Sequence, residues 1–325
     1  MLQRKSAERW LQRSGLLAVC WALAGAAWAV VLDPPDLRCV SYAPTEQVTL
    51  SWLPPSDPGG DFLHYEVWAA DAEAGPYTLV TTVPGLATNT VTVAGGGADV
   101  AVRFFRMTSV STAPPPNTSV PSTVLATMLI TVGQSSPLGS ATINWGLPHT
   151  PPLPTTDQVE VQMEYPLGTF STVATLGAGQ TFHNHLITIC EDSLSFRIVA
   201  TDASGCTMVS TAMGATFRDV TPPAVPQMVS VSVDTLTNRT LITWDIPPDP
   251  DTEGYIVIYN DGGTNLLIDT VYGAANNTFV WDESDASLGT EGYRIAAFDS
   301  CWSGEPPSPN TSAANTMHTT MYAST

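Results

Sequence analysis

Three tryptophans stand in nearly the same local sequence, each soon followed by a proline: Trp52, Trp145 and Trp244. Their spacing of roughly 100 residues matches one small β-sandwich and is too long for a solenoid repeat. Before the first of them, Val48 and Leu50 alternate with polar residues, which places the apolar side chains on one face of a strand. The repeat therefore predicts an all-β chain of three tandem sandwiches.

Two more landmarks follow each tryptophan in the same order. The first is a short apolar strand, and the second is an aromatic residue directly before an arginine. We predict that the aromatic landmarks form the structural core: Trp52, Trp145, Trp244, Phe105, Phe196 and Tyr293. The predicted domains span residues 33–130, 131–220 and 224–325. Linkers are expected in the proline- and glycine-containing stretches 132–139 and 219–226.

Residues 1–29 have the composition of a secretory signal peptide. A basic start containing Lys5 precedes a short apolar run and the small-residue motif Ala27-Trp28-Ala29. The apolar run is shorter than the ~20 residues of a membrane-spanning helix, so we expect no stable membrane span in the mature chain. The sequence therefore predicts a secreted or cell-surface protein.

The charge balance excludes two classes of partner. The chain has a net charge of -19, and its only lysine lies in the predicted signal peptide. Such an acidic chain does not bind a phosphate backbone or an anionic lipid surface, because like charges repel. We expect no nucleic-acid partner, and 43% hydrophobic residues supply ample material for folded cores.

The third predicted domain resembles a fibronectin type III domain most closely. Trp244, Pro247, Tyr255, Val257 and Tyr293 occupy the positions that this family uses for its strand-B tryptophan and its strands C and F. The resemblance implies a β-sandwich with an immunoglobulin-like fold. It also implies a tyrosine-corner hydrogen bond, which among the strand-F aromatic residues only Tyr293 has the hydroxyl to make.

A narrower resemblance concerns residues 221–226, 244–255 and 297–301. They are similar to tandem fibronectin-type segments of exported, gliding-motility-associated surface proteins of the Bacteroidetes. That group usually carries a C-terminal sorting domain after such arrays, and none is visible here. The resemblance implies that the chain is a truncated product or the N-terminal part of a longer protein.

Four cysteines follow the predicted signal peptide: Cys39, Cys190, Cys206 and Cys301. An even number in an exported chain predicts disulfides, and four cysteines allow three connectivities. Cys190 and Cys206 share one domain and are a possible pair. A strand between them would hold them roughly 30 Å apart, whereas bridged Cα atoms lie about 6 Å apart. In the alternative, Cys39 and Cys301 pair with neighbouring domains or chains.

Signatures of catalysis are missing from the sequence. It contains no nucleophile elbow, no zinc-protease motif, no phosphate loop and no Cys-x-x-Cys pair. His183 and His185 share a strand face but have no further ligand beside them, and the acidic run at 249–253 is typical of a turn. We therefore expect a non-enzymatic chain with no cofactor and no metal site.

Trp68, Trp281 and Trp302 lie outside the repeated pattern and are possible ligand-contact residues, because exposed aromatic rings stack on sugars. The sequence favours a stalk or an adhesion and protein-interaction array whose partner is a surface or extracellular protein or a glycan. One alternative is a carbohydrate-binding module. Another is the accessory N-terminal part of an exported hydrolase truncated at residue 325.

Overall fold

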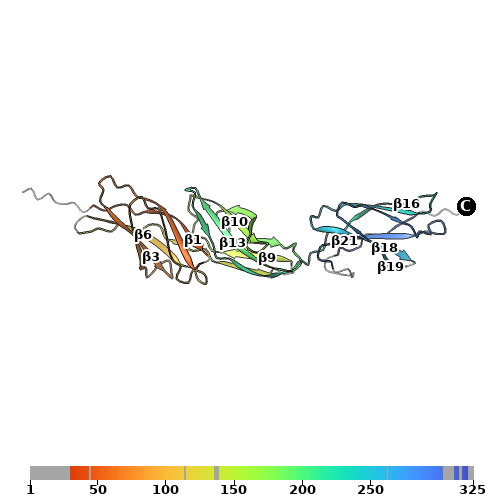
Figure 1. Ribbon diagram of the computed structural model, residues 1–325, viewed down its shortest axis with the longest axis horizontal. Coiled ribbons are helices and arrows are strands. Elements are labelled where there is room, and N and C mark those ends of the chain that lie inside the picture. Colours follow the sequence, from red (N-terminus) through yellow and green to blue (C-terminus); the bar gives the residue numbers. More distant parts are fainter. Residues whose placement is uncertain are drawn as a thin grey trace, which may run out of the picture.

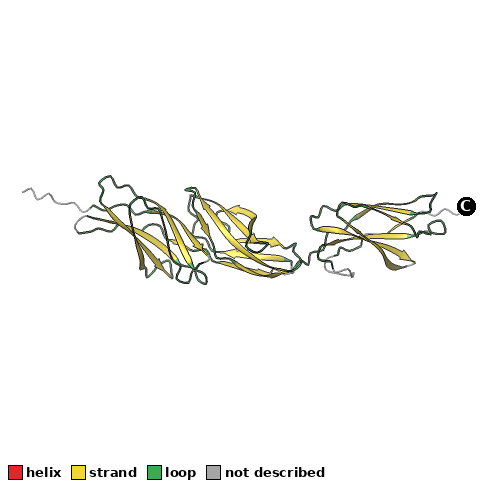
Figure 2. Ribbon diagram, viewed as in Figure 1, coloured by secondary structure: helices red, strands yellow, loops and turns green. Residues whose placement is uncertain are grey.

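The computed structural model describes residues 30–320 apart from 44, 113–114, 135–138, 262, 303–310 and 315–316. The predicted signal peptide lies outside this part. The described residues form strands and loops only (Figure 2). Among them there is no helix of the length and apolar character that a membrane span requires.

The first sandwich contains seven strands in two sheets, ordered β1-β2-β5 and β4-β3-β6-β7. Its strands are β1 (Asp36–Ala43), β2 (Gln47–Leu53), β3 (Phe62–Ala70), β4 (Thr78–Pro84), β5 (Thr90–Ala94), β6 (Phe104–Ser111) and β7 (Leu125–Ala126). All neighbouring strands pair antiparallel.

The middle sandwich repeats this order as β8-β9-β12 and β11-β10-β13-β14. Its strands are β8 (Ile130–Gln134), β9 (Ser140–Trp145), β10 (Thr156–Glu164), β11 (Phe170–Gly177), β12 (Phe182–Leu186), β13 (Asp192–Asp202), β14 (Thr207–Val209) and β15 (Met213–Phe217). Two strands share the edge position next to β13 in its larger sheet, because β14 and β15 each pair with a different half of β13.

The third sandwich has the sheets β16-β17-β20 and β19-β18-β21-β22. Its strands are β16 (Gln227–Val233), β17 (Thr240–Asp245), β18 (Thr252–Asp261), β19 (Thr264–Tyr272), β20 (Thr278–Trp281), β21 (Gly292–Asp299) and β22 (His318–Thr319). The three sandwiches follow one another along the long axis of the molecule (Figure 1).

Sheets of three and four strands in this order characterise the fibronectin type III sandwich, so the chain is a tandem array of fibronectin type III-like domains. The sequence prediction of an all-β fold with three sandwiches is confirmed. One predicted linker is misplaced, because β8 begins at Ile130 and residues 132–134 therefore belong to a strand of the middle sandwich. The domain limits themselves stay a prediction.

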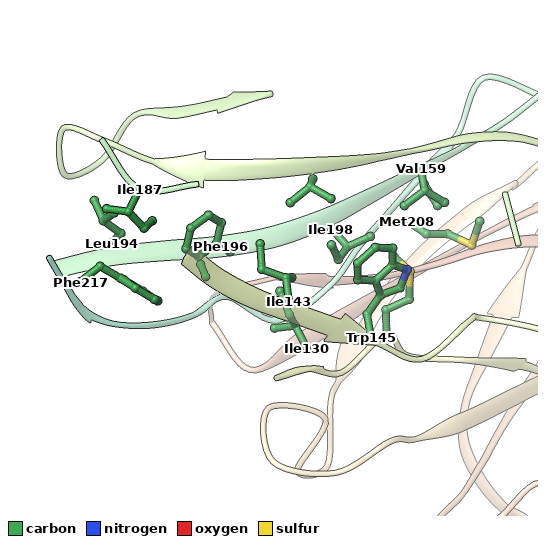
Figure 3. Close-up of a cluster of buried hydrophobic side chains, with 14 of the residues drawn as sticks. Ile130, Ile143, Trp145, Val159, Ile187, Leu194, Phe196, Ile198, Met208 and Phe217 are labelled. Carbon is green, nitrogen blue, oxygen red and sulfur yellow. The ribbon is translucent and has the colours of Figure 1, made fainter. Parts of the chain in front are cut away.

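Period-two alternation explains why each sandwich closes around a core. In β2, Val48, Leu50 and Trp52 are buried while the residues between them are half-buried. The middle sandwich shows the same principle in β13, where Phe196 and Ile198 turn inward toward Trp145 (Figure 3). A strand with one apolar face is stable only when a second sheet covers that face.

All six aromatic landmarks lie in these cores. Trp145 is the most exposed of them, at 5% of its surface, and Trp52, Trp244, Phe105, Phe196 and Tyr293 are more deeply buried. In the first and third sandwiches the tryptophan also meets a strand-C tyrosine edge-to-face, with ring centroids 5.3 and 5.1 Å apart. Such pairs add to the free energy gained from burial alone.

The tyrosine hydrogen bonds differ from the expectation. Tyr65 donates its hydroxyl proton to the Leu86 carbonyl at 2.7 Å, and Tyr255 donates to the Ala274 carbonyl at 2.8 Å. A tyrosine corner pairs the hydroxyl with a backbone group, but Tyr293 donates to the Glu291 carboxylate at 2.6 Å, so the predicted tyrosine-corner bond of Tyr293 is wrong. Glu291 provides a stronger, charged acceptor two residues away in the same buried region.

Candidate functional site

The four cysteines join the three sandwiches in series. Cys39 of β1 is bonded to Cys206 in the loop between β13 and β14, with a Cα separation of 6.3 Å. Cys190, just before β13, is bonded to Cys301, just after β21, with a Cα separation of 4.9 Å. The possible pair Cys190 and Cys206 is therefore wrong. These residues flank an extended strand and lie at its opposite ends, which is the distance problem that the sequence already indicated.

We name the contact between the first and middle sandwiches the first junction. Cys39 is 1% exposed and packs within the core cluster of the middle sandwich. In the reverse direction, Leu153 packs against the core of the first sandwich. Each sandwich thus covers apolar surface of its neighbour, and this burial fixes their relative orientation.

Hydrogen bonds reinforce the first junction. The Arg38 guanidinium donates to the Thr155 hydroxyl at 2.9 Å, and the Val209 amide donates to the Ser41 hydroxyl at 3.1 Å. Burial raises the pKa of Asp202, but hydrogen bonds from its neighbours and the charge of Arg38 more than offset that and leave the pKa of Asp202 below its ordinary value. The first junction is therefore both packed and charge-matched.

The second junction, between the middle and third sandwiches, has a different character. Both cysteines of its bridge are half-buried, and the Cys190 sulfur contacts the Ser300 hydroxyl at 3.6 Å. A further hydrogen bond fixes the connecting segment, since the Ala224 amide donates to the Asp249 carboxylate at 2.9 Å. Figure 1 shows a narrow neck between these two sandwiches.

Acidic residues gather around the second junction. Burial, a hydrogen bond with Asp249 and the nearby negative charges raise the pKa of Asp251 to about 7. Asp219 and Asp299 are among these charges. Such a shift means that Asp251 binds a proton near neutral pH, because two carboxylates that share a site resist double ionisation. The part of the chain that the structure describes contains no group of three potential metal ligands placed around one point.

The three candidate ligand-contact tryptophans occupy different environments. Trp68, on the outer face of β3, donates from its indole nitrogen to the Thr108 hydroxyl at 3.2 Å. Trp281 leans against Tyr259 in the margin of the third core, with ring centroids 4.6 Å apart. Trp302 lies over Phe298, with centroids 4.4 Å apart. The structure does not bring the three tryptophans together, since they belong to different faces and sandwiches.

The outer face of the four-stranded sheet differs between the third sandwich and the other two. In the first two sandwiches an arginine covers an aromatic ring there, Arg106 over Tyr77 and Arg197 over Phe170, each 3.9 Å from the ring centroid. In the third, where Arg294 stands at the corresponding position opposite Ile258, the same face contains a mainly apolar groove of about 410 Å³. Ile256, Ile258, Leu267 and Ala296 contribute to its lining. The groove was not predicted from the sequence, although the apolar run at 255–258 breaks the alternation of β18 and marks a strand that is apolar on both faces.

His183 and His185 turn toward the middle core. The ring of His185 meets the Phe196 ring edge-on at 5.9 Å, and the two histidine rings are 6.2 Å apart. Burial lowers the pKa of both, and the neighbouring His183 lowers that of His185 further. The pair is therefore neutral at physiological pH and helps to fill the core margin.

No protein-family model matches the chain, and no curated protein matches it. Solved structures match it at low identity, and two of them are tandem fibronectin arrays. The FN1–FN3 domains of chicken CNTN1 are 14% identical, with 89% of this chain and 98% of that chain covered and a TM-score of 0.27. The central fibronectin-III array of RIM-binding protein is 16% identical, with 90% and 97% covered and a TM-score of 0.24.

Proposed function

We propose that the chain is a non-enzymatic, secreted or cell-surface array that acts as a stalk and holds an adhesion or interaction surface away from its point of attachment. The observation that carries the proposal is the pair of disulfides that join three sandwiches end to end. Bridges of this kind form and persist in oxidising compartments, which supports export. Within this proposal, the resemblance to gliding-motility-associated surface proteins supplies the cell-surface setting.

The stalk proposal is tested by small-angle X-ray scattering on the oxidised chain without residues 1–29. A single compact body of this length has a radius of gyration of roughly 19 Å. We expect a radius clearly above that value and a pair-distance distribution with a long tail, because the sandwiches follow one another along one axis. A radius close to 19 Å would exclude a stalk.

A second candidate function is ligand binding by the third sandwich. The groove on its outer face has a volume within the ~300–1,000 Å³ range of small-molecule sites, and Trp302 belongs to the same apolar face. In this alternative the ligand is a glycan or an apolar side chain of a surface protein. Trp302 packs on the same face without lining the groove, and it is the aromatic contact to test because Trp281 is partly buried against the core.

A glycan array distinguishes the two candidates. Binding by the wild type that Trp302→Ala abolishes and Trp68→Ala leaves unchanged would establish the groove face as a carbohydrate site. Trp281→Ala serves as the stability control, since it removes a ring packed against Tyr259 and Tyr293. An array without signal for the wild type would remove the carbohydrate-binding candidate and leave the stalk.

A further inference from the structure

The two disulfides overlap along the chain. The first spans 167 residues from Cys39 to Cys206, and the second spans 111 residues from Cys190 to Cys301. Because Cys190 precedes Cys206, the segment 190–206 belongs to both loops. This overlap turns two separate links into one continuous covalent route through the molecule.

Tension applied at the two ends of a chain follows the shortest covalent path. Here that path enters along residues 30–39, crosses to Cys206, returns along the chain to Cys190 and crosses to Cys301. Residues 40–189 and 207–300 form closed side loops that carry no load once the path is taut. The bypassed loops contain most strands of all three sandwiches.

The middle of this path is β13, the longest strand in the described part of the chain, with 11 residues. A strand rises about 3.3 Å per residue, so this strand is already close to full extension in the folded state. Fully stretched, the segment 190–206 reaches roughly 60 Å, against roughly 40 Å when folded. Without the bridges, the chain between Cys39 and Cys301 would reach roughly 900 Å.

The loaded strand is also well anchored. It pairs with β10 along one edge and with β14 and β15 along the other, so a pull along the strand loads many hydrogen bonds at once. Leu194, Phe196, Ile198 and Ala200 fix its inner face in the core. Sliding the strand would expose this apolar surface to water, which opposes the movement.

The outer ends of the path are held in their own sandwiches. Near the N-terminus, Ser111 donates its hydroxyl proton to the Val30 carbonyl at 2.8 Å. Near the C-terminus, the Ser312 amide donates to the Ala297 carbonyl at 2.8 Å, and the Thr320 amide donates to the Glu291 carbonyl at 2.9 Å. In each sandwich the load therefore passes along one short stretch of chain.

We propose that the overlapping bridges make this array a tether of nearly fixed length, in which tension bypasses the folded bulk of every sandwich. The proposal goes beyond a stalk, because it assigns the covalent route of the load and predicts that the domains stay folded under pulling. It holds whatever the array presents, since it depends on the connectivity of Cys39, Cys190, Cys206 and Cys301 alone.

Single-molecule force spectroscopy on the chain without residues 1–29, held at both termini, tests the proposal. In the oxidised wild type we expect the part between Cys39 and Cys301 to lengthen by only about 20 Å. In the presence of a dithiol reductant, which opens both bridges by exchange, the same molecule should release about 900 Å in several steps. Reduction of the wild type keeps the test independent of whether any variant folds.

Two double variants locate the route. The double variant Cys39→Ser with Cys206→Ser removes the first bridge. It should release about 500 Å of chain under force, because residues 40–189 then enter the loaded path. The double variant Cys190→Ser with Cys301→Ser removes the second bridge and should release about 300 Å of chain from residues 207–300. Ser300→Ala, which alters only a neighbour of the Cys190 sulfur, is the matched control and should keep the oxidised trace.

Successive releases of about 300 Å in the oxidised wild type, or identical traces with and without reductant, would overturn the proposal. Neither result bears on the overall shape that scattering reports. A compact scattering profile with a short, reductant-sensitive tether would refute only the stalk. An extended profile with large oxidised releases would refute only the fixed-length tether.

Discussion

The two junctions use the same covalent link in different surroundings. At the first, Cys39 lies inside the core of the neighbouring sandwich and the bridge adds to an interface that is already packed. At the second, neither cysteine is buried in a core, and the bridge lies beside a cluster of acidic residues that repel one another. The comparison teaches that a disulfide stabilises a packed interface in one place and substitutes for packing in the other.

The largest effect expected from this comparison follows from removing the first bridge at its buried cysteine, Cys39. Cys39→Ala breaks the link and leaves a cavity in the middle core, so we expect a loss of about 3–5 kcal/mol in the free energy of unfolding. Cys301→Ala should cost less, because its sulfur packs in no comparable core. Urea unfolding monitored by tryptophan fluorescence measures both. Equal losses at the two junctions would contradict the comparison.

The acidic second junction should respond to pH. Asp251 has a pKa of about 7 when folded against an ordinary value of 3.8, so the folded state holds a proton that the unfolded state releases. Its stabilising contribution is complete below about pH 4 and is lost as the pH rises through about 7. After allowance for solvent screening, Asp251→Asn should stabilise the chain by about 1–2 kcal/mol at pH 8.

Thermal unfolding of this variant between pH 4 and pH 8 provides the check. The melting temperature of the wild type relative to that of Asp251→Asn should fall over this interval, since the lowered pKa values of His183 and His185 affect both chains equally. Asp245→Asn, an exposed substitution on β17 of the same sandwich, is the control and should follow the wild type. A difference between the two melting temperatures that stays constant from pH 4 to pH 8 would refute the assignment.

Exposure also predicts the order in which the bridges are reduced. Cys190, Cys301 and Cys206 are half-buried, whereas Cys39 is 1% exposed, so a reductant reaches both sulfurs of the second bridge but only the Cys206 sulfur of the first. We expect the second bridge to open faster under native conditions, since exchange needs access to a sulfur and both of its sulfurs are accessible. Timed alkylation followed by mass spectrometry measures the order. Faster alkylation of Cys39 would show that the first junction opens in solution.

The smallest expected effect concerns the polar contacts of the first junction. Thr155→Val removes the acceptor of the Arg38 guanidinium and should cost about 1 kcal/mol of unfolding free energy. Thr175→Val, at an exposed position on β11 of the same sandwich, should be nearly neutral. Urea unfolding of both variants measures the difference. A loss of stability as small as that of Thr175→Val would show that packing alone holds the junction.

The sequence predicted the repeat because Trp52, Trp145 and Trp244 report local alternation and burial, which nearby residues decide. The bridges depend on which ends of neighbouring sandwiches meet, and no local pattern carries that information. The sequence did argue against one pairing, since an extended strand cannot bring Cys190 to Cys206. The hydrogen-bond partner of Tyr293 was not predicted for a similar reason, because the buried Glu291 carboxylate accepts this bond in place of a backbone carbonyl.

Disulfide mapping of the oxidised chain tests the central claim most directly. Arginines at positions 38, 106, 197, 218 and 294 separate the four cysteines, so a tryptic digest places each on its own peptide. The structure predicts one linked pair of peptides that joins Cys39 to Cys206 and another that joins Cys190 to Cys301. A peptide pair that joins Cys190 to Cys206 would contradict the series connection and the load path that depends on it.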